Sequence, residues 1–65
     1  MKFVEYWIHY DLDDTRYVPG REWQRVRKLV AHPTADIHSI ERVEQTFDRY
    51  GDLLDNEYKT IYERI

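Results

Sequence analysis

Apolar and polar positions alternate at the start of the chain and predict a β-strand from Lys2 to Leu12. Side chains two residues apart share one face of a strand, so this alternation indicates a face that packs against a core. β-Branched and aromatic residues dominate the segment, and these types suit a pleated sheet. We expect one face to carry Val4, Tyr6, Ile8 and Tyr10, and the other to carry Phe3 and Trp7 among polar residues.

A turn at Asp13–Arg16, a short extended segment and a helix are predicted next. Tyr17-Val18 is short and extended because Pro19 disfavours a helical conformation in the residue before it. Pro19-Gly20 then opens a helix that His32-Pro33 ends. Apolar residues recur at spacings of three and four, as is typical of a helix with one buried face, at Trp23, Val26, Leu29 and Val30.

The remainder of the chain, residues 39–65, allows two interpretations. In the first it forms two helices, because the apolar positions from Ile40 onward fall close to a heptad repeat. Ser39 would cap the first of these helices and Gly51 would end it.

In the second interpretation the same residues form a hairpin, with strands at Ser39–Phe47 and Leu53–Tyr62. Asp48–Gly51 has the composition of a type I turn, with Asp at the first position and Gly at the fourth, where Gly51 suits the left-handed bulge residue of a three-residue hairpin loop. We favour the hairpin because the first strand needs a partner for its backbone groups. The turn would place Phe47 opposite Leu53, and Glu41 opposite Lys59.

The predicted fold is therefore α+β, in the order β-α-β-β, and forms a single domain over residues 1–65. One helix packs across a three-stranded, mostly antiparallel sheet. The alternative is an N-terminal strand followed by a small helical bundle. An open sheet has two edge strands, and edge strands are templates for pairing with another chain.

Composition limits how such a short chain can be stabilised. The absence of cysteine excludes disulfides, thiolate zinc sites and cysteine nucleophiles. Six Tyr, two Trp and two Phe supply large apolar surfaces to a domain that is otherwise marginal at 65 residues. Self-association would bury more surface, so we expect a homodimer.

The expected cellular location and the distribution of charge limit the classes of partner that the chain can bind. We find neither an apolar run of membrane-spanning length nor the pattern of a signal peptide, so we expect a cytoplasmic protein that does not bind membranes. The net charge is −3, but the helix segment, residues 21–32, is locally basic. Most of the chain should therefore repel nucleic acid, while this one segment could attract phosphate or an acidic surface.

Neither a metal site nor a catalytic centre is predicted. The acidic turn that begins at Asp11 lacks the glycine and the distant glutamate of a calcium loop. His9, His32 and His38 are not at the spacing of metal ligands. Ser39 follows His38, but neighbouring strand residues point to opposite faces, so the imidazole cannot activate the hydroxyl. We expect a protein that is not an enzyme and binds no cofactor.

The leading functional hypothesis is a protein-interaction module that regulates or inhibits a protein partner. Outward aromatic side chains form association patches, and Trp and Tyr are prominent in interface hot spots. Chains of this size and order of elements are common among small phage and mobile-element proteins. The predicted protein-binding residues are Phe3, Trp7, Asp13 and Asp14.

Two alternatives remain open. A structural subunit of a larger assembly would expose the same surface. A nucleic-acid-binding regulator would use the basic helix and stack bases on nearby aromatic rings, although a pI of about 5.5 is low for that class. Its candidate residues are Arg21, Arg25, Arg27 and Lys28.

Overall fold

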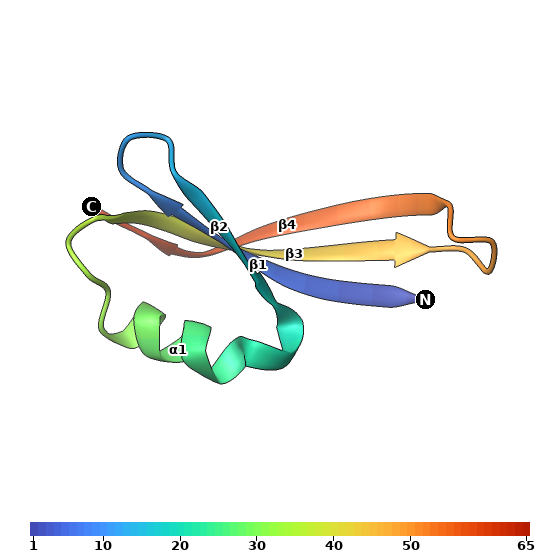
Figure 1. The fold of residues 1–65 in the computed structure, drawn as a ribbon, viewed down its shortest axis with the longest axis horizontal. Coiled ribbons are helices and arrows are strands. Elements are labelled where there is room, and N and C mark those ends of the chain that lie inside the picture. Colours follow the sequence, from blue (N-terminus) through green and yellow to red (C-terminus); the bar gives the residue numbers. More distant parts are fainter.

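The computed structural model describes residues 1–65 as one helix against a sheet of four antiparallel strands (Figure 1). The sheet has the order β2-β1-β3-β4, and α1 lies across one of its faces. The α+β class is confirmed. No helix is both long enough and apolar enough to cross a membrane. The elements are β1 (Lys2–Tyr10), β2 (Thr15–Pro19), a 3₁₀ turn (Gly20–Glu22), α1 (Trp23–Ala31), β3 (Ile37–Phe47) and β4 (Leu53–Glu63).

The prediction of three strands is wrong by one. The extended segment at Tyr17-Val18 is the centre of β2, a complete strand that pairs antiparallel with β1. The reason is that β1 would otherwise present a row of unpaired backbone groups on this side. β1 also ends at Tyr10 rather than Leu12, because Leu12 and Asp13 have left-handed backbone conformations, with φ of 64° and 60°.

The hairpin interpretation of residues 39–65 is confirmed, and the helical alternative is wrong. The turn between β3 and β4 is organised by Asp48, whose Oδ1 accepts hydrogen bonds from the backbone N–H of Tyr50 (2.8 Å) and of Asp52 (3.0 Å). The Gly51 N–H donates to the Asp48 carbonyl at 3.1 Å. Gly51 has φ of +86°, as expected for the residue after a type I turn.

The register of the hairpin agrees with the prediction only near the turn. Phe47 lies opposite Leu53, as expected. Glu41, however, lies opposite Thr60 rather than Lys59. A β-bulge beside Phe47 gives β4 one extra residue, and a shift of one residue moves every later side chain to the other face.

The core lies between α1 and the sheet. Only seven of the 65 residues are buried, so the core is small even for a domain of this length. Tyr6, Leu29 and Tyr62 pack around it while remaining partly exposed. Its buried members are Ile8, Val18, Val26, Ile37 and Ile40.

The start of the helix approaches β1 very closely. A Cβ atom on Gly20 would lie 2.5 Å from the carbonyl oxygen of Val4, so only glycine fits this position. Of the predicted apolar stripe, Val26 is buried, whereas Trp23 is 45 % exposed. The Trp23 ring lies instead beside the Arg27 guanidinium, 5.9 Å from its centroid.

The β3–β4 hairpin extends well beyond the N-terminal end of α1 (Figure 1). The N-terminal half of β1 lies alongside it, so three strands form an arm that the helix does not cover. The molecule is accordingly elongated, with extents of 41 × 23 × 16 Å.

Candidate functional site

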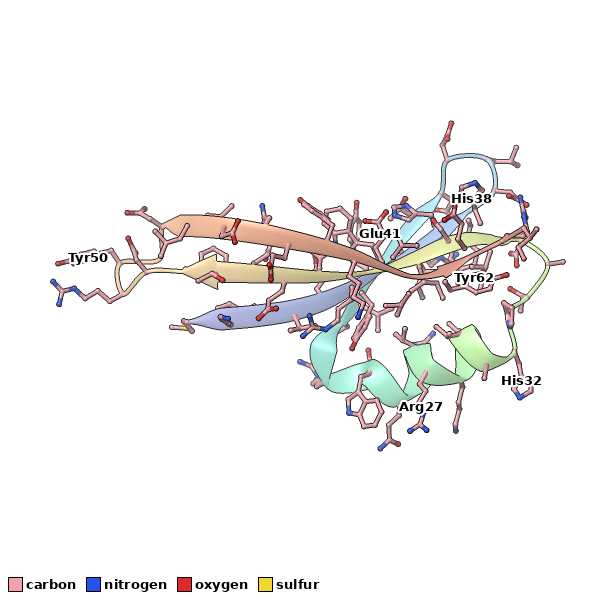
Figure 2. The ribbon with its side chains drawn as sticks, turned by 180° about the vertical axis from the view of Figure 1, so that it is seen from behind. Arg27, His32, His38, Glu41, Tyr50 and Tyr62 are labelled. Carbon is pink, nitrogen blue, oxygen red and sulfur yellow. The ribbon has the colours of Figure 1, made fainter.

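Aromatic side chains line the face of the sheet that points away from α1. Residues opposite one another in antiparallel strands project from the same side, so the register determines which side chains share this face. Figure 2 shows Glu41 on this side of the sheet and Tyr62 on the side of the helix. We call this surface the aromatic face, and its aromatic residues are Phe3, Trp7, Tyr17, Phe47 and Tyr58.

Trp7 is the centre of the aromatic face. Its ring makes edge contacts with Tyr17 on β2 and with Tyr58 on β4, at centroid distances of 5.4 Å and 5.5 Å. The indole Nε1–H donates a hydrogen bond of 2.6 Å to Oε1 of Glu5. The polar edge of the indole is therefore satisfied within the chain, and edge-to-face contacts fix the ring on both sides.

A second aromatic pair occupies the arm. Phe3 and Phe47 make an edge contact at 5.6 Å, and Leu53 lies opposite Phe47. Phe3 is 52 % exposed, Tyr17 is 62 % exposed and Tyr58 is 55 % exposed. These apolar surfaces are joined across the strands, whereas isolated exposed apolar residues are ordinary on any protein.

The two faces of the sheet differ in charge. The register places every lysine and arginine of the strands on the side of α1, at Lys2, Arg16, Arg42 and Lys59. The aromatic face carries carboxylates at Glu5, Glu41 and Glu63 and neither of the strongly basic residue types. A cationic group would therefore meet carboxylates and aromatic rings together on this face.

His9 lies on the aromatic face between two polar neighbours. Its Nδ1 is 3.0 Å from the Thr15 hydroxyl, and its Nε2 is 3.3 Å from Oε1 of Glu41. The Nε2 atom is buried, and its direction toward Glu41 does not satisfy hydrogen-bond geometry. The sequence gives no sign of this contact, because strand pairing alone brings the three residues together.

Asp13 and Asp14, predicted to bind a partner, lie exposed in the turn between β1 and β2. They lie beyond the last paired residues of β1 and β2, so the structure does not group them with Phe3 on the arm. Their neighbour Asp11 accepts two hydrogen bonds from the Arg64 guanidinium, at 3.0 Å and 2.9 Å. Those bonds lower the pKa of the Asp11 carboxyl below its usual value.

The basic helix surface is separate from the aromatic face. Its four cations, Arg21, Arg25, Arg27 and Lys28, are exposed, and no salt bridge joins any of them to a carboxylate. Figure 2 shows Arg27 pointing from α1 away from the sheet. Trp7 and Tyr17 lie on the far side of the sheet, so phosphate contacts and base stacking on those rings would not share one surface.

Three members of the aromatic face are not among the residues predicted from the sequence to bind a partner: Tyr17, Phe47 and Tyr58. Each lies on a strand that pairs directly or indirectly with β1, and its face depends on the register. The bulge in β4 makes the face of Tyr58 unpredictable from alternation alone. The signal that could have found Tyr17 is its place in a short extended segment one turn after Trp7.

The described chain contains no group of three or more His, Cys, Asp or Glu residues that could hold a metal ion. Comparisons with models of known protein families, with curated protein sequences and with solved structures found no match.

Proposed function

We propose that this chain is a non-enzymatic protein-interaction module that binds a protein partner through the aromatic face. One observation carries the proposal. Five aromatic residues share an uncovered sheet face, and Trp7 is held at its centre by two neighbouring rings and a hydrogen bond. Trp and Tyr are the residue types that contribute most at interface hot spots.

The arrangement of the rings also favours binding. A side chain that is ordered only on binding costs about 0.5–1.5 kcal/mol of conformational entropy. Trp7 already contacts both Tyr17 and Tyr58 in the free chain, so this cost is largely avoided. Aromatic side chains also have few rotatable bonds, so they give a large contact area at a low cost in conformational entropy.

Charge defines the chemistry of the partner. The exposed rings call for an apolar complementary surface. Because the aromatic face also carries Glu5 and Glu41 and has no lysine or arginine, that surface should include arginine or lysine side chains. A guanidinium could stack on the exposed Tyr17 ring while reaching a carboxylate. By covering such a surface, the module would regulate or inhibit its partner, and we propose that it does so in the cytoplasm.

Affinity capture from extracts of the source cells tests this proposal, followed by binding measurements with the purified partner. Tyr17→Ser removes an exposed ring of the aromatic face. Tyr50→Ser is the matched control, because Tyr50 is 75 % exposed at the tip of the hairpin. We expect Tyr17→Ser to weaken binding about tenfold or more, since hot-spot side chains contribute about 2 kcal/mol or more, and Tyr50→Ser to have no effect. Equal binding by both variants, or a failure to capture any partner, would overturn the proposal.

One observation favours a second candidate, a nucleic-acid-binding regulator. The four exposed cations of the basic helix surface form no ion pair within the chain, so they are free to meet phosphates. A structural subunit of a larger assembly would use the aromatic face, and its partner would be recovered in fixed stoichiometry.

A further inference from the structure

The outer edge of β4 is the longest unpaired edge of the sheet. β4 has eleven residues, and its outer side lies at the margin of the sheet, where no element covers the arm (Figure 1). The other edge strand, β2, has five residues and ends in Pro19, which cannot donate a hydrogen bond. Natural proteins protect sheet edges with short strands, proline, bulges or charged side chains, and β2 is both short and ended by proline. β4 has Lys59 and a bulge near each end, and residues 55–60 between the two bulges pair regularly with β3.

Two charged residues on β4 face like charges in the folded chain. Glu57 lies opposite Glu44, and Lys59 lies opposite Arg42. Directly opposed like charges destabilise a sheet. The charge of Glu44 is compensated by ion pairs with Lys2 and Arg42, with N–O distances of 3.5 Å and 3.4 Å. Glu57 and Lys59 make no ion pair.

We propose that a second copy of this chain pairs antiparallel with β4, with the two-fold axis passing between the two Tyr58 residues. In this register Glu57 of each copy lies opposite Lys59 of the other copy. Two opposite-charge pairs form, and each of the four charges gains the counterion that its own sheet does not provide. The pair of sheets becomes one continuous eight-stranded sheet.

Charge excludes the neighbouring registers. Centring the pairing on Asp55, Glu57 or Lys59 places each of these residues opposite its own copy. Centring it on Asn56 places Asp55 opposite Glu57. A shift in the other direction, to Thr60, brings the bulge that follows this residue into the middle of the paired segment.

The register centred on Tyr58 also joins features of the aromatic face. Asn56 would lie opposite Thr60 of the second copy, on the same side as the two Tyr58 rings. Tyr58 of each copy would meet the other, so the rings that begin at Tyr17 would continue across the axis.

The inference uses the β4 edge and is independent of the proposed function. Glu57 and Lys59 project from the side of the sheet opposite to the aromatic face. A wild-type chain that remains monomeric would overturn the inference and leave binding through Tyr17 untouched. If the chain is a dimer but its Tyr17→Ser variant still binds the partner, the proposed function is overturned and the inference about the β4 edge stands.

The test is the molar mass of the full chain by light scattering and sedimentation over a range of concentrations. We expect the wild type to have twice the 8.1 kDa mass of one chain. Lys59→Glu turns both ion pairs into Glu–Glu contacts and should weaken dimerisation about tenfold or more. Glu57→Lys should do the same, and the double exchange Glu57→Lys/Lys59→Glu should restore the dimer.

Asp55→Lys is the matched control for Glu57→Lys. It also replaces an acidic residue of β4 by lysine, but at a position outside the two ion pairs. We expect it to leave the dimer intact. Glu57 and Lys59 are exposed, and circular dichroism of each variant confirms that the monomer remains folded. Failure of the double exchange to restore the dimer, or equal dissociation by Asp55→Lys, would overturn the proposed register.

Discussion

Tyr58 lies directly opposite Val43 on the neighbouring strand, and Val43 is 0 % exposed although α1 lies on the other side of the sheet. Trp7 is a diagonal neighbour of Val43, within reach of an aromatic ring. Val43 does not belong to the core cluster under the helix. The aromatic face therefore buries an apolar residue of its own, which makes it a packed surface rather than a set of separate rings.

Truncation of Val43 should consequently destabilise the fold. We expect Val43→Ala to lower the free energy of unfolding by about 2 kcal/mol, because it leaves a cavity under the rings. Urea denaturation at neutral pH measures the change. A loss below about 0.5 kcal/mol, as is usual for a surface substitution, would show that the rings do not pack on Val43.

The two glycines should differ in their response to alanine. Gly51→Ala introduces a side chain into open space and costs about 1 kcal/mol, because alanine disfavours the left-handed conformation. Gly20→Ala places a Cβ against the backbone of β1, so we expect a larger loss of about 2–3 kcal/mol. Thermal melts of the two variants side by side test this order. Equal losses would contradict the close contact between Gly20 and Val4.

Stability should fall in acid partly through Asp11. Arg64 lowers the pKa of Asp11 in the folded state below its usual 3.8. A carboxyl with a lowered folded pKa stabilises the fold fully above its unfolded pKa, and this contribution is lost as the pH falls through the folded value. The urea midpoint of the wild type should therefore fall more steeply below about pH 4 than that of Asp11→Asn.

Glu44 acts in the same direction, because Arg42 and then Lys2 lower its pKa, so Asp11→Asn should retain part of the pH dependence. Identical pH profiles for the wild type and Asp11→Asn would show that the contact with Arg64 contributes nothing in solution.

Nucleic-acid binding should be no stronger than nonspecific association. The cations of the basic helix surface and the rings of the aromatic face lie on different sides of the molecule. We expect a fluorescent single-stranded oligonucleotide to bind with a Kd no tighter than about 10⁻⁶–10⁻⁴ M at physiological salt. A much tighter complex that weakens steeply with salt and is lost in Arg25→Glu would instead support the nucleic-acid regulator.

Local patterns predict the elements of this fold better than their pairing. Alternation in β1, the apolar spacing in α1 and the Asp48–Gly51 turn each depend on neighbouring residues, and each gives the right type of element. The sequence predicts three strands rather than four, because β2 is short and becomes a strand only by pairing with β1. The predicted cross-strand partner of Glu41, Lys59, is wrong because bulges leave no signal in the periodicity of the sequence.

The candidate site was predictable to the same degree. Alternation places Phe3 and Trp7 on one side of β1, without reference to other strands. Tyr58 and Phe47 join them only through the sheet order and the bulge. The contact of His9 with Thr15 and Glu41 involves three strands and could not have been read from one segment.

The two tryptophans distinguish a partner bound on the aromatic face from one bound on the helix, because Trp7 lies on the aromatic face and Trp23 lies on α1. Each indole N–H gives its own signal in a ¹H–¹⁵N spectrum of the labelled chain. When the purified partner is added, binding through the aromatic face predicts that the Trp7 signal shifts or broadens while the Trp23 signal stays in place. A change at Trp23 alone would contradict the account and place the partner on the helix.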